Sequence, residues 1–374
     1  MDTLSKPDLS IAKGTCYLLL AYDVARAIDL DQVERHVVAM KQREVLKHGR
    51  RAPKYFEYQP PPLRITQDVA PMAIGDYRSS ASVDLVLYDF GAVSVVYTIP
   101  LMGPLSELLT LSNDLYEATS LLADSRKHVE QLLALIGSAV SKPRIANFVE
   151  DYAIYHIEAF TGLHDIEDLC TRYAQDIAQI LRAETQPLSP QEVMDALAQR
   201  SSFRVDDVTI VDWNAALLVD REGDDVRTVL EFANVELLEL RYLDRSLDDA
   251  LDRSYQALTM PQRNSLLGLG RFGADRHHVA RMQVDSAILF EGVNNALKLL
   301  GDQYLSRVYR LVSQRLHLAE WDAGIIRKLQ TLESIYEKMS DQATTRRMEV
   351  LEWIIIILIA ISIILPFLPG GYGH

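Results

Sequence analysis

The sequence has few of the residues on which common catalytic and structural sites depend. It contains only two cysteines, Cys16 and Cys170, which excludes a disulfide scaffold and any metal cage built from cysteines alone. It has no G-x-S-x-G elbow, Walker loop, HExxH pair or cysteine–histidine nucleophile pattern. Basic residues are outnumbered, with 38 Lys and Arg against 52 Asp and Glu and a formal net charge of −14. A nucleic-acid face needs clustered basic residues, so we expect no nucleic-acid partner.

One glycine-rich string has the spacing of a dinucleotide-binding loop. In GLGRFG, the glycines are Gly268, Gly270 and Gly273. This spacing binds pyrophosphate only where it joins a strand to the N-terminus of a helix. The preceding SYQALTMPQRNSLL reads as a helix end and a proline-broken loop, so we predict an inter-helix loop and no cofactor.

The histidines do not form a metal-binding pattern. His277 and His278 are adjacent, so on a helix they would point about 100° apart. His156 and Glu158 share one face of a predicted strand, but no third ligand lies nearby in sequence. We therefore predict no metal and no catalytic residue.

Two segments of similar pattern indicate an internal duplication. VDLVLYDFGAVSVVY (83–97) aligns without gaps with DDVTIVDWNAALLVD (206–220). The alignment pairs Asp89 with Asp212, and Gly91 with Asn214. Gly and Asn tolerate positive φ, so both segments read as tight hairpins. We expect each Asp to accept hydrogen bonds from its turn.

The repeat extends upstream, where a strand precedes an Asp at a helix N-cap, Asp29 in one half and Asp165 in the other. Long helical patterns follow the hairpins near 104–136 and 226–258. The predicted fold is α+β, with two duplicated ferredoxin-like strand-helix-hairpin-helix units at 1–142 and 143–260.

A helical stalk is predicted over 261–345. Its apolar positions alternate spacings of four and three, which is typical of a heptad seam. The pattern covers fewer than three heptads and leaves two structures open: a coiled coil between copies, or a hairpin against a helix at 286–314. The seam residues are Ile325, Leu329, Leu332, Tyr336 and Met339.

The last segment, 346–374, carries a strongly apolar run in which residues 353 to 368 include no charge. Leaving about a dozen large apolar side chains in water would cost on the order of 20 kcal/mol, so something must cover them. A bilayer, a folded core or a partner chain could do so, and we predict a transmembrane helix. Its predicted anchor residues are Trp353, Ile354, Ile355, Ile356, Ile357, Leu358, Ile359, Ile361, Ile363, Ile364 and Leu365. Arg346 and Arg347 precede the run, which by the positive-inside rule predicts a single-pass protein with most of the chain cytoplasmic.

The tail KLQTLESIYEKMSDQATTRRMEVLEWIIIILIAISII and the hairpin LVLYDFGAVSVV resemble the required-for-meiotic-nuclear-division family. The resemblance is specific over the last forty residues or so and around the first hairpin. It implies a membrane-anchored, non-catalytic protein whose mitochondrial relatives lie at the inner membrane and support translation. The acidic first thirty residues do not resemble a transit peptide, so we expect a bacterial inner-membrane relative.

These patterns predict a tail-anchored scaffold or assembly factor that presents an α+β domain to an unidentified protein partner. The other expected partners are the lipid bilayer and further copies of the chain. One alternative is a membrane-bound enzyme with a site between the repeats, using Asp89, Asp212, His156 or the Gly268 loop. The other is a soluble oligomer that buries its C-terminal helix.

Overall fold

The computed structural model describes residues 9–41, 48–51, 60–259 and 303–364. The chain forms two compact units. Unit 1 comprises residues 1–242 and 287–322, and unit 2 comprises residues 243–286 and 323–374. Both predicted repeats contribute to unit 1, up to residue 242. The four-part division of the chain stays a prediction.

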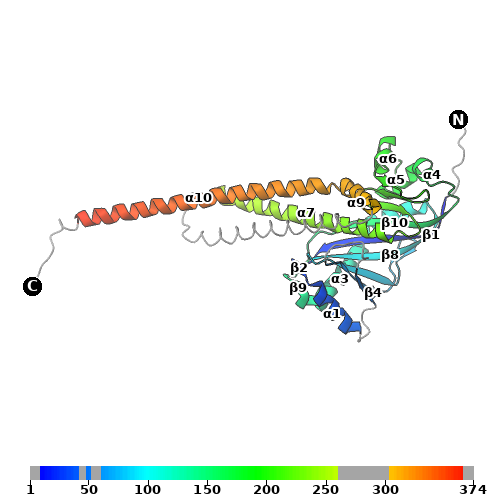
Figure 1. Cartoon of the computed structure of the whole chain (residues 1–374), viewed down its shortest axis with the longest axis horizontal. Helices are drawn as coiled ribbons and strands as arrows, with labels where there is room; N and C mark the ends of the chain where they lie inside the picture. The colour runs from blue at the N-terminus through cyan, green and yellow to red at the C-terminus, as the bar shows by residue number, and fades with distance from the viewer. Residues whose placement is uncertain (1–8, 42–47, 52–59, 260–302, 365–374) are drawn as a thin grey trace, which may run out of the picture. The chain divides into compact units, whose positions relative to one another are not determined.

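Unit 1 is built on one mixed sheet of nine strands, in the order β11-β12-β13-β10-β1-β8-β7-β4-β3 (Figure 1). Two further ladders pair β2 with β9 and β5 with β6. The strands are β1 (Ser10–Asp23), β2 (Ala27–Ile28), β3 (His48–Arg51), β4 (Leu63–Asp68), β5 (Ala73–Ile74), β6 (Tyr77–Arg78), β7 (Ser82–Leu87), β8 (Ala92–Pro104), β9 (Val140–Ser141), β10 (Glu150–Thr161), β11 (Arg200–Ser201), β12 (Val208–Val211) and β13 (Ala215–Val219).

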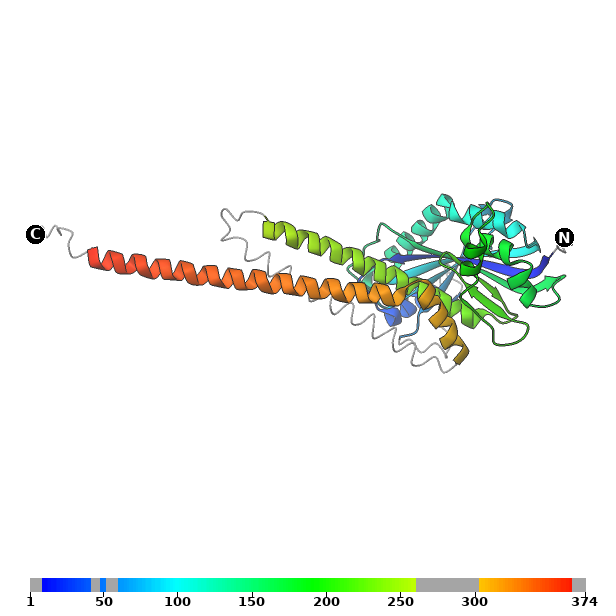
Figure 2. The same ribbon diagram turned by 90° about the horizontal axis from the view of Figure 1, so that it is seen from above.

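Helices cover both faces of the sheet. The helices are α1 (Leu30–Lys41), α2 (Glu107–Tyr116), α3 (Thr119–Ile136), α4 (Glu167–Thr171), α5 (Ala174–Arg182), α6 (Pro190–Ala196), α7 (Asp224–Thr259), α9 (Gln303–Arg315) and α10 (Leu318–Ile364), and a 3-10 turn spans Gly137–Ala139. One core joins α1, α2, α3 and α5 to one face of the sheet. The first part of α7 covers the other face, where the Arg227 guanidinium lies 4.6 Å from the Tyr17 ring. Figure 2 shows α3 and α9 on opposite sides of the strands.

The central strand β1 is apolar on both sides because both sheet faces are covered. Leu18 and Leu20 point into the core under α2 and α3. Leu19 and Ala21 alternate with them and are also fully buried. A strand buried on both faces reads as a continuous apolar run rather than as an alternation. The run CYLLLAY is therefore the sequence of a central strand.

The α+β class is confirmed, but the two halves are not copies of one topology. The first predicted hairpin is β7–β8, and β8 pairs antiparallel with β1. The second is β12–β13, but β13 pairs parallel with β10. The last strand of the first hairpin is thus antiparallel to the first strand of its half, whereas the last strand of the second hairpin is parallel to the first strand of its half. All these strands join one sheet because β1 and β10 pair with each other along their length.

The predicted N-cap is present in the first half, whereas in the second half the cap residue of α4 is Ile166 and Asp165 lies one residue before it. The Asp29 carboxylate accepts a hydrogen bond from the Gln32 amide at 2.9 Å, just before α1. The Asp165 carboxylate accepts one from the Glu167 amide at 3.1 Å, at the start of α4. Each side chain satisfies an amide that has no partner inside its helix.

Unit 2 contains the second part of α7 and most of α10. The Lys328 ammonium pairs with Asp244 and Asp248 at 2.7 and 2.6 Å. The Ser254 hydroxyl donates to the Tyr336 hydroxyl at 3.3 Å. Residue numbers rise together in these pairs, so the two helices run parallel.

The predicted seam is mostly buried in unit 2. Ile325, Leu329 and Leu332 are buried, and Tyr336 is half-buried. The Met339 side chain lies outside the described residues, as does much of the predicted hairpin partner at 286–314. The described helix that contacts the seam region is α7, which the sequence did not indicate.

The predicted transmembrane helix is wrong. Among the described residues, no helix is long and apolar enough to cross a membrane. The apolar part of α10 that the structure describes, Trp353 to Ile364, is about 18 Å long at 1.5 Å per residue, whereas a hydrocarbon core is about 30 Å thick. Extending it toward the N-terminus brings in Glu352, Glu349 and Arg347.

The predicted single-pass localisation is overturned by the same finding. It relied on a span at 353–365 and on Arg346 and Arg347 as the positive flank. Both arginines lie within α10, but their side chains are outside the described residues, as is the whole of Leu365. The side chains from Trp353 to Ile361 are exposed.

The β7–β8 turn gives a first test of the fold. Gly91 has φ +105°, and a Cβ there would lie 2.0 Å from the Ala25 carbonyl oxygen. We expect Gly91→Ala to lower the free energy of unfolding by roughly 2–4 kcal/mol, because both strain and a backbone clash oppose it. Urea unfolding measures the change. Gly137→Ala is the control, since nothing lies within 4 Å of its Cβ position; equal effects of the two substitutions would contradict this turn geometry.

Candidate functional site

The candidate site is built around Asp212, at the turn between β12 and β13. The Asp212 side chain is fully buried. The Asp212 amide donates to the Ala215 carbonyl at 2.9 Å, and the Asp212 carboxylate accepts a hydrogen bond from the Trp213 amide at 2.9 Å. The Asn214 carbonyl accepts from the Ala153 amide at 3.1 Å, which ties the turn to β10. Asp212 therefore bonds its own turn, as the sequence predicted.

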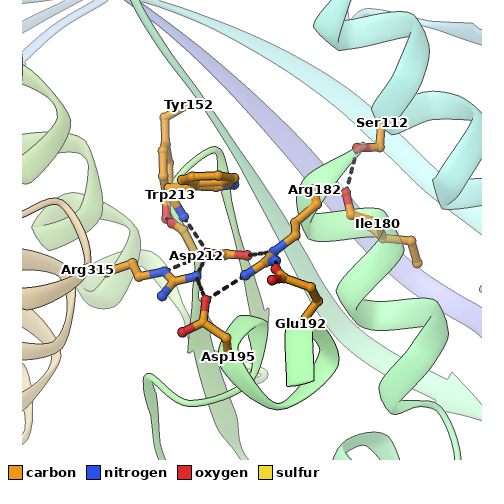
Figure 3. Close-up of polar contacts among 9 residues, drawn as sticks. All are labelled: Ser112, Tyr152, Ile180, Arg182, Glu192, Asp195, Asp212, Trp213 and Arg315. Carbon is orange, nitrogen blue, oxygen red and sulfur yellow. Dashed lines mark hydrogen bonds and ion pairs between the residues drawn. The ribbon is translucent and has the colours of Figure 1, made fainter. Parts of the chain in front are cut away.

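Two arginines bind the Asp212 carboxylate from different elements (Figure 3). Arg182 Nε donates to Oδ2 at 2.9 Å, and Arg315 Nε donates to Oδ1 at 2.6 Å. Arg182 is the last residue of α5, and Arg315 is the last residue of α9. A cation is favoured at a helix C-terminus, where carbonyl groups lack intrahelical partners. One buried carboxylate thus joins the ends of two helices to a sheet turn.

A second carboxylate bridges the same two arginines. Asp195 Oδ2 accepts hydrogen bonds from Arg182 Nη2 at 2.7 Å and from Arg315 Nη2 at 2.8 Å. The hydrogen bond from Arg315 lowers the pKa of Asp195. Glu192, one turn earlier on α6, also pairs with Arg182. The Ser189 hydroxyl accepts from the Glu192 amide, which caps α6 and fixes the position of both acids.

Two aromatic residues complete the site. The Tyr152 hydroxyl, from β10, donates to the Asp212 carbonyl at 2.8 Å. The Trp213 ring lies with its centroid 5.5 Å from the Arg182 guanidinium carbon, a cation–π geometry. The Trp213 amide is hydrogen-bonded to Asp212, and Arg182 is held by its ion pairs, yet the Trp213 side chain remains 57 % exposed. We call Arg182, Glu192, Asp195, Asp212, Trp213 and Arg315 the Asp212 cluster.

Further arginine–carboxylate pairs line the same end of the sheet. Glu150, at the start of β10, pairs with Arg241 of α7. Asp23, at the end of β1, accepts two hydrogen bonds from Arg144, at 2.8 and 3.1 Å. Burial raises the pKa of Asp23 to about 6 and that of Glu150 to about 7, against the opposing effect of their arginines. For each carboxylate, the unfavourable free energy of desolvation is thus larger than the favourable free energy of pairing with its arginine.

The structure keeps the predicted site residues apart. Asp89 and Asp212 lie in turns at the same end of the sheet, but β10 and β1 lie between β13 and β8. Three strand spacings separate the hairpins by about 14 Å. The Asp89 carbonyl accepts from the Ile28 amide at 2.8 Å, and the Gly91 carbonyl accepts from the Val24 amide at 2.9 Å. This turn therefore binds backbone groups beside β1.

The remaining candidates are also spread through the chain. His156 lies inside β10, and its Nε2 is 2.8 Å from the Asp220 carbonyl oxygen. Glu158 pairs with Lys13. The Gly268 loop, His277 and His278 lie outside the described residues. Within the described part of the chain, no group of three His, Cys, Asp or Glu residues is placed to hold a metal ion. The enzyme alternative stays a prediction.

Most of the Asp212 cluster was not predicted from the sequence. Asp212 was identified as a turn residue, but Arg182, Asp195 and Arg315 were given no role. Arg315 lies 103 residues from Asp212 in sequence, and neither periodicity nor motif spacing relates two such positions. The available signal was weak: Arg182 and Arg315 each end an amphipathic helical pattern, where a cation is common.

Comparison with known proteins identifies the family of this chain. Residues 13–225 match the family described as "Uncharacterized protein MJ0711, N-terminal domain". The chain belongs to this family. Uncharacterized protein MJ0711 of Methanocaldococcus jannaschii is 22% identical over 238 residues, which cover 63% of this chain and 71% of that protein. The MJ0711 N-terminal-domain match includes Arg182, Asp195 and Asp212 but ends before Arg315. The resemblance to the required-for-meiotic-nuclear-division family stays a prediction.

Removing the charge of Asp212 tests the cluster. We expect Asp212→Asn to lower the free energy of unfolding by about 3 kcal/mol, because it leaves two poorly exposed guanidinium groups without their main counter-charge. Urea unfolding of the full chain measures the loss. Asp195→Asn is the matched control, and it should cost less than about 1 kcal/mol because the Asp195 side chain is half exposed. The two substitutions would have equal effects if Asp212 were not central.

A buried carboxyl group also joins α7 to α9. Glu236 lies on α7 and accepts a hydrogen bond from the Tyr309 hydroxyl of α9 at 2.6 Å. Burial raises the pKa of Glu236 to about 8, although the Tyr309 hydrogen bond opposes the change, and the nearby Asp322 raises the pKa further. Near neutral pH, the folded protein therefore holds a proton on Glu236 that the unfolded chain releases.

This proton uptake predicts a pH dependence. Between the unfolded pKa near 4.5 and the folded value near 8, the folded state binds more protons, so the free energy of unfolding falls as pH rises. The slope is up to about 1.4 kcal/mol per pH unit. We expect Glu236→Gln to flatten this slope in urea unfolding at pH 6, 7 and 8. Glu222→Gln, at an exposed position before α7, should keep it; an unchanged slope in Glu236→Gln would contradict the assignment.

Proposed function

We propose that the protein is a non-catalytic scaffold or assembly factor, and that a partner protein binds unit 1 at the β12–β13 turn. The observation that carries the proposal is the exposed Trp213 ring on a turn fixed by the Asp212 cluster. Tryptophan is enriched among the residues that contribute most to binding at protein interfaces. A side chain fixed before binding loses little conformational entropy on binding. Trp213 combines these two properties.

The polar groups of the cluster support a binding role over a catalytic one. Both Asp212 oxygens accept hydrogen bonds from arginines, and the two guanidinium groups also bind Asp195. A general acid or base needs a group that can reach a substrate proton. Asp212 is fully buried behind its arginines, so the surface offered to another molecule is mainly the indole ring and the outer acids.

The charge around Trp213 indicates the chemistry of the partner. The cluster contains three carboxylates and two guanidinium groups, and the Glu192 and Asp195 side chains are each about half exposed. The whole chain has a formal net charge of −14. A partner that places an apolar side chain on the indole, with lysine or arginine beside it, would match both the ring and the acids.

Substitution at Trp213 tests this proposal. We expect Trp213→Ala to lose a partner that copurifies with the full chain from its native cells. With the purified partner, Trp213→Ala should raise the Kd by more than tenfold, because truncating a central interface tryptophan costs about 2 kcal/mol or more. Copurification, followed by calorimetry on the purified pair, provides the measurement.

Tyr116→Ala is the matched control, since Tyr116 is an exposed aromatic residue at the end of α2. It should leave both copurification and Kd unchanged. The proposal fails if the Trp213 and Tyr116 variants recover the same proteins in the same amounts.

A further inference from the structure

The C-terminal part of α10 exposes a continuous apolar surface in unit 2. Trp353 is 65 % exposed, and Ile354, Ile357, Leu358 and Ile361 are 46 to 60 % exposed. Every residue from Trp353 to Ile361 is uncharged. A helix that is apolar on all sides is normally buried. Exposed apolar surface of this extent marks an interaction site.

This surface continues the seam that packs inside unit 2. The buried residues Ile325, Leu329 and Leu332 alternate spacings of four and three along α10. The same alternation passes through Ala343, Arg346 and Val350 to Trp353, Ile357 and Ala360 in one helix, and Arg346 is the one charged residue at these positions. The stripe that faces α7 in the first part of α10 therefore extends along the helix into the exposed region.

The described partner helix ends before the stripe does. Ser254 of α7 contacts Tyr336 of α10, and α7 ends soon afterwards at Thr259. Because the two helices run parallel, the described part of α7 ends before the level of Trp353, whereas α10 continues to Ile364. The stripe on α10 thus has a packed partner along its first part and exposed apolar residues, Trp353 and Ile357, at the same spacing in its second part.

A second copy of this chain is the occupant that fits. The required partner is a helix with an uncharged apolar stripe of equal length, and each copy brings one. Between Trp353 and Ile361 the contact would bring no like charges together, although the chain as a whole is strongly acidic. Closed assemblies of identical subunits are also the commonest form of oligomer.

We infer that copies of the chain assemble through α10, with Trp353, Ile357 and Ala360 in the contact between them. This interface is separate from the partner surface at Trp213. The assembly holds two or more unit 1 bodies together, so a partner bound at Trp213 is presented more than once. Multivalent presentation raises avidity without any new contact.

Sedimentation equilibrium of the full chain at about 10 µM, without detergent, tests the inference. The expected mass is a discrete multiple of 42.2 kDa. Ile357→Glu should reduce the mass to that of one chain. Ile326→Glu is the matched control, because it makes the same change at an exposed position of the same helix outside the run. It should leave the mass unchanged, and Trp213→Ala should do the same.

A second variant keeps the test decisive if Ile357→Glu fails to fold. Ala360→Cys should form a covalent dimer under mild oxidation, in excess of that formed by the parent chain, and Ala323→Cys should not. A full chain that sediments as a monomer would overturn the inference. So would aggregates of undefined mass, equal effects of the glutamates at 326 and 357, or equal crosslinking at 323 and 360.

Discussion

The arrangement of the second half of unit 1 depends on one buried charge. Asp212 lies at a sheet turn, and its two oxygens bind Arg182 at the end of α5 and Arg315 at the end of α9. A buried carboxylate without these partners would carry a large desolvation penalty. Once paired, it fixes two helix ends against one turn, and Asp195 and Trp213 take their positions from the same arginines. The proposed binding surface is a consequence of this packing.

Buried carboxyl groups recur where α7, α9 and the strand ends meet. Asp23 and Glu150 pair with arginines at the strand ends, and Glu236 bonds Tyr309. Burial raises the pKa of all three. Such groups add little net stability compared with apolar residues of similar size, but each accepts only a few donors in defined directions. They therefore specify how helices and strands meet, which apolar packing alone specifies less sharply.

The apolar end of α10 shows how one pattern admits several structures. A run of isoleucine and leucine predicts that the segment is covered, because its exposure to water is unfavourable. The run does not identify what covers the segment. We predicted a bilayer, but the apolar part that the structure describes is too short, and charged residues precede it within the same helix. The regular seam spacing is also visible in the sequence, and it favours packing against another helix.

The sequence by itself determined the α+β class, the two hairpins, the Asp29 cap of α1 and the buried stripe of α10, because each depends on residues close together in the chain. Periodicity and turn chemistry report such local relations directly. Only the tertiary structure decided that the second hairpin pairs parallel with β10, and that Asp212 meets Arg182 and Arg315. Those contacts join elements far apart in sequence, and their geometry depends on the packing of the whole unit. No local pattern encodes it.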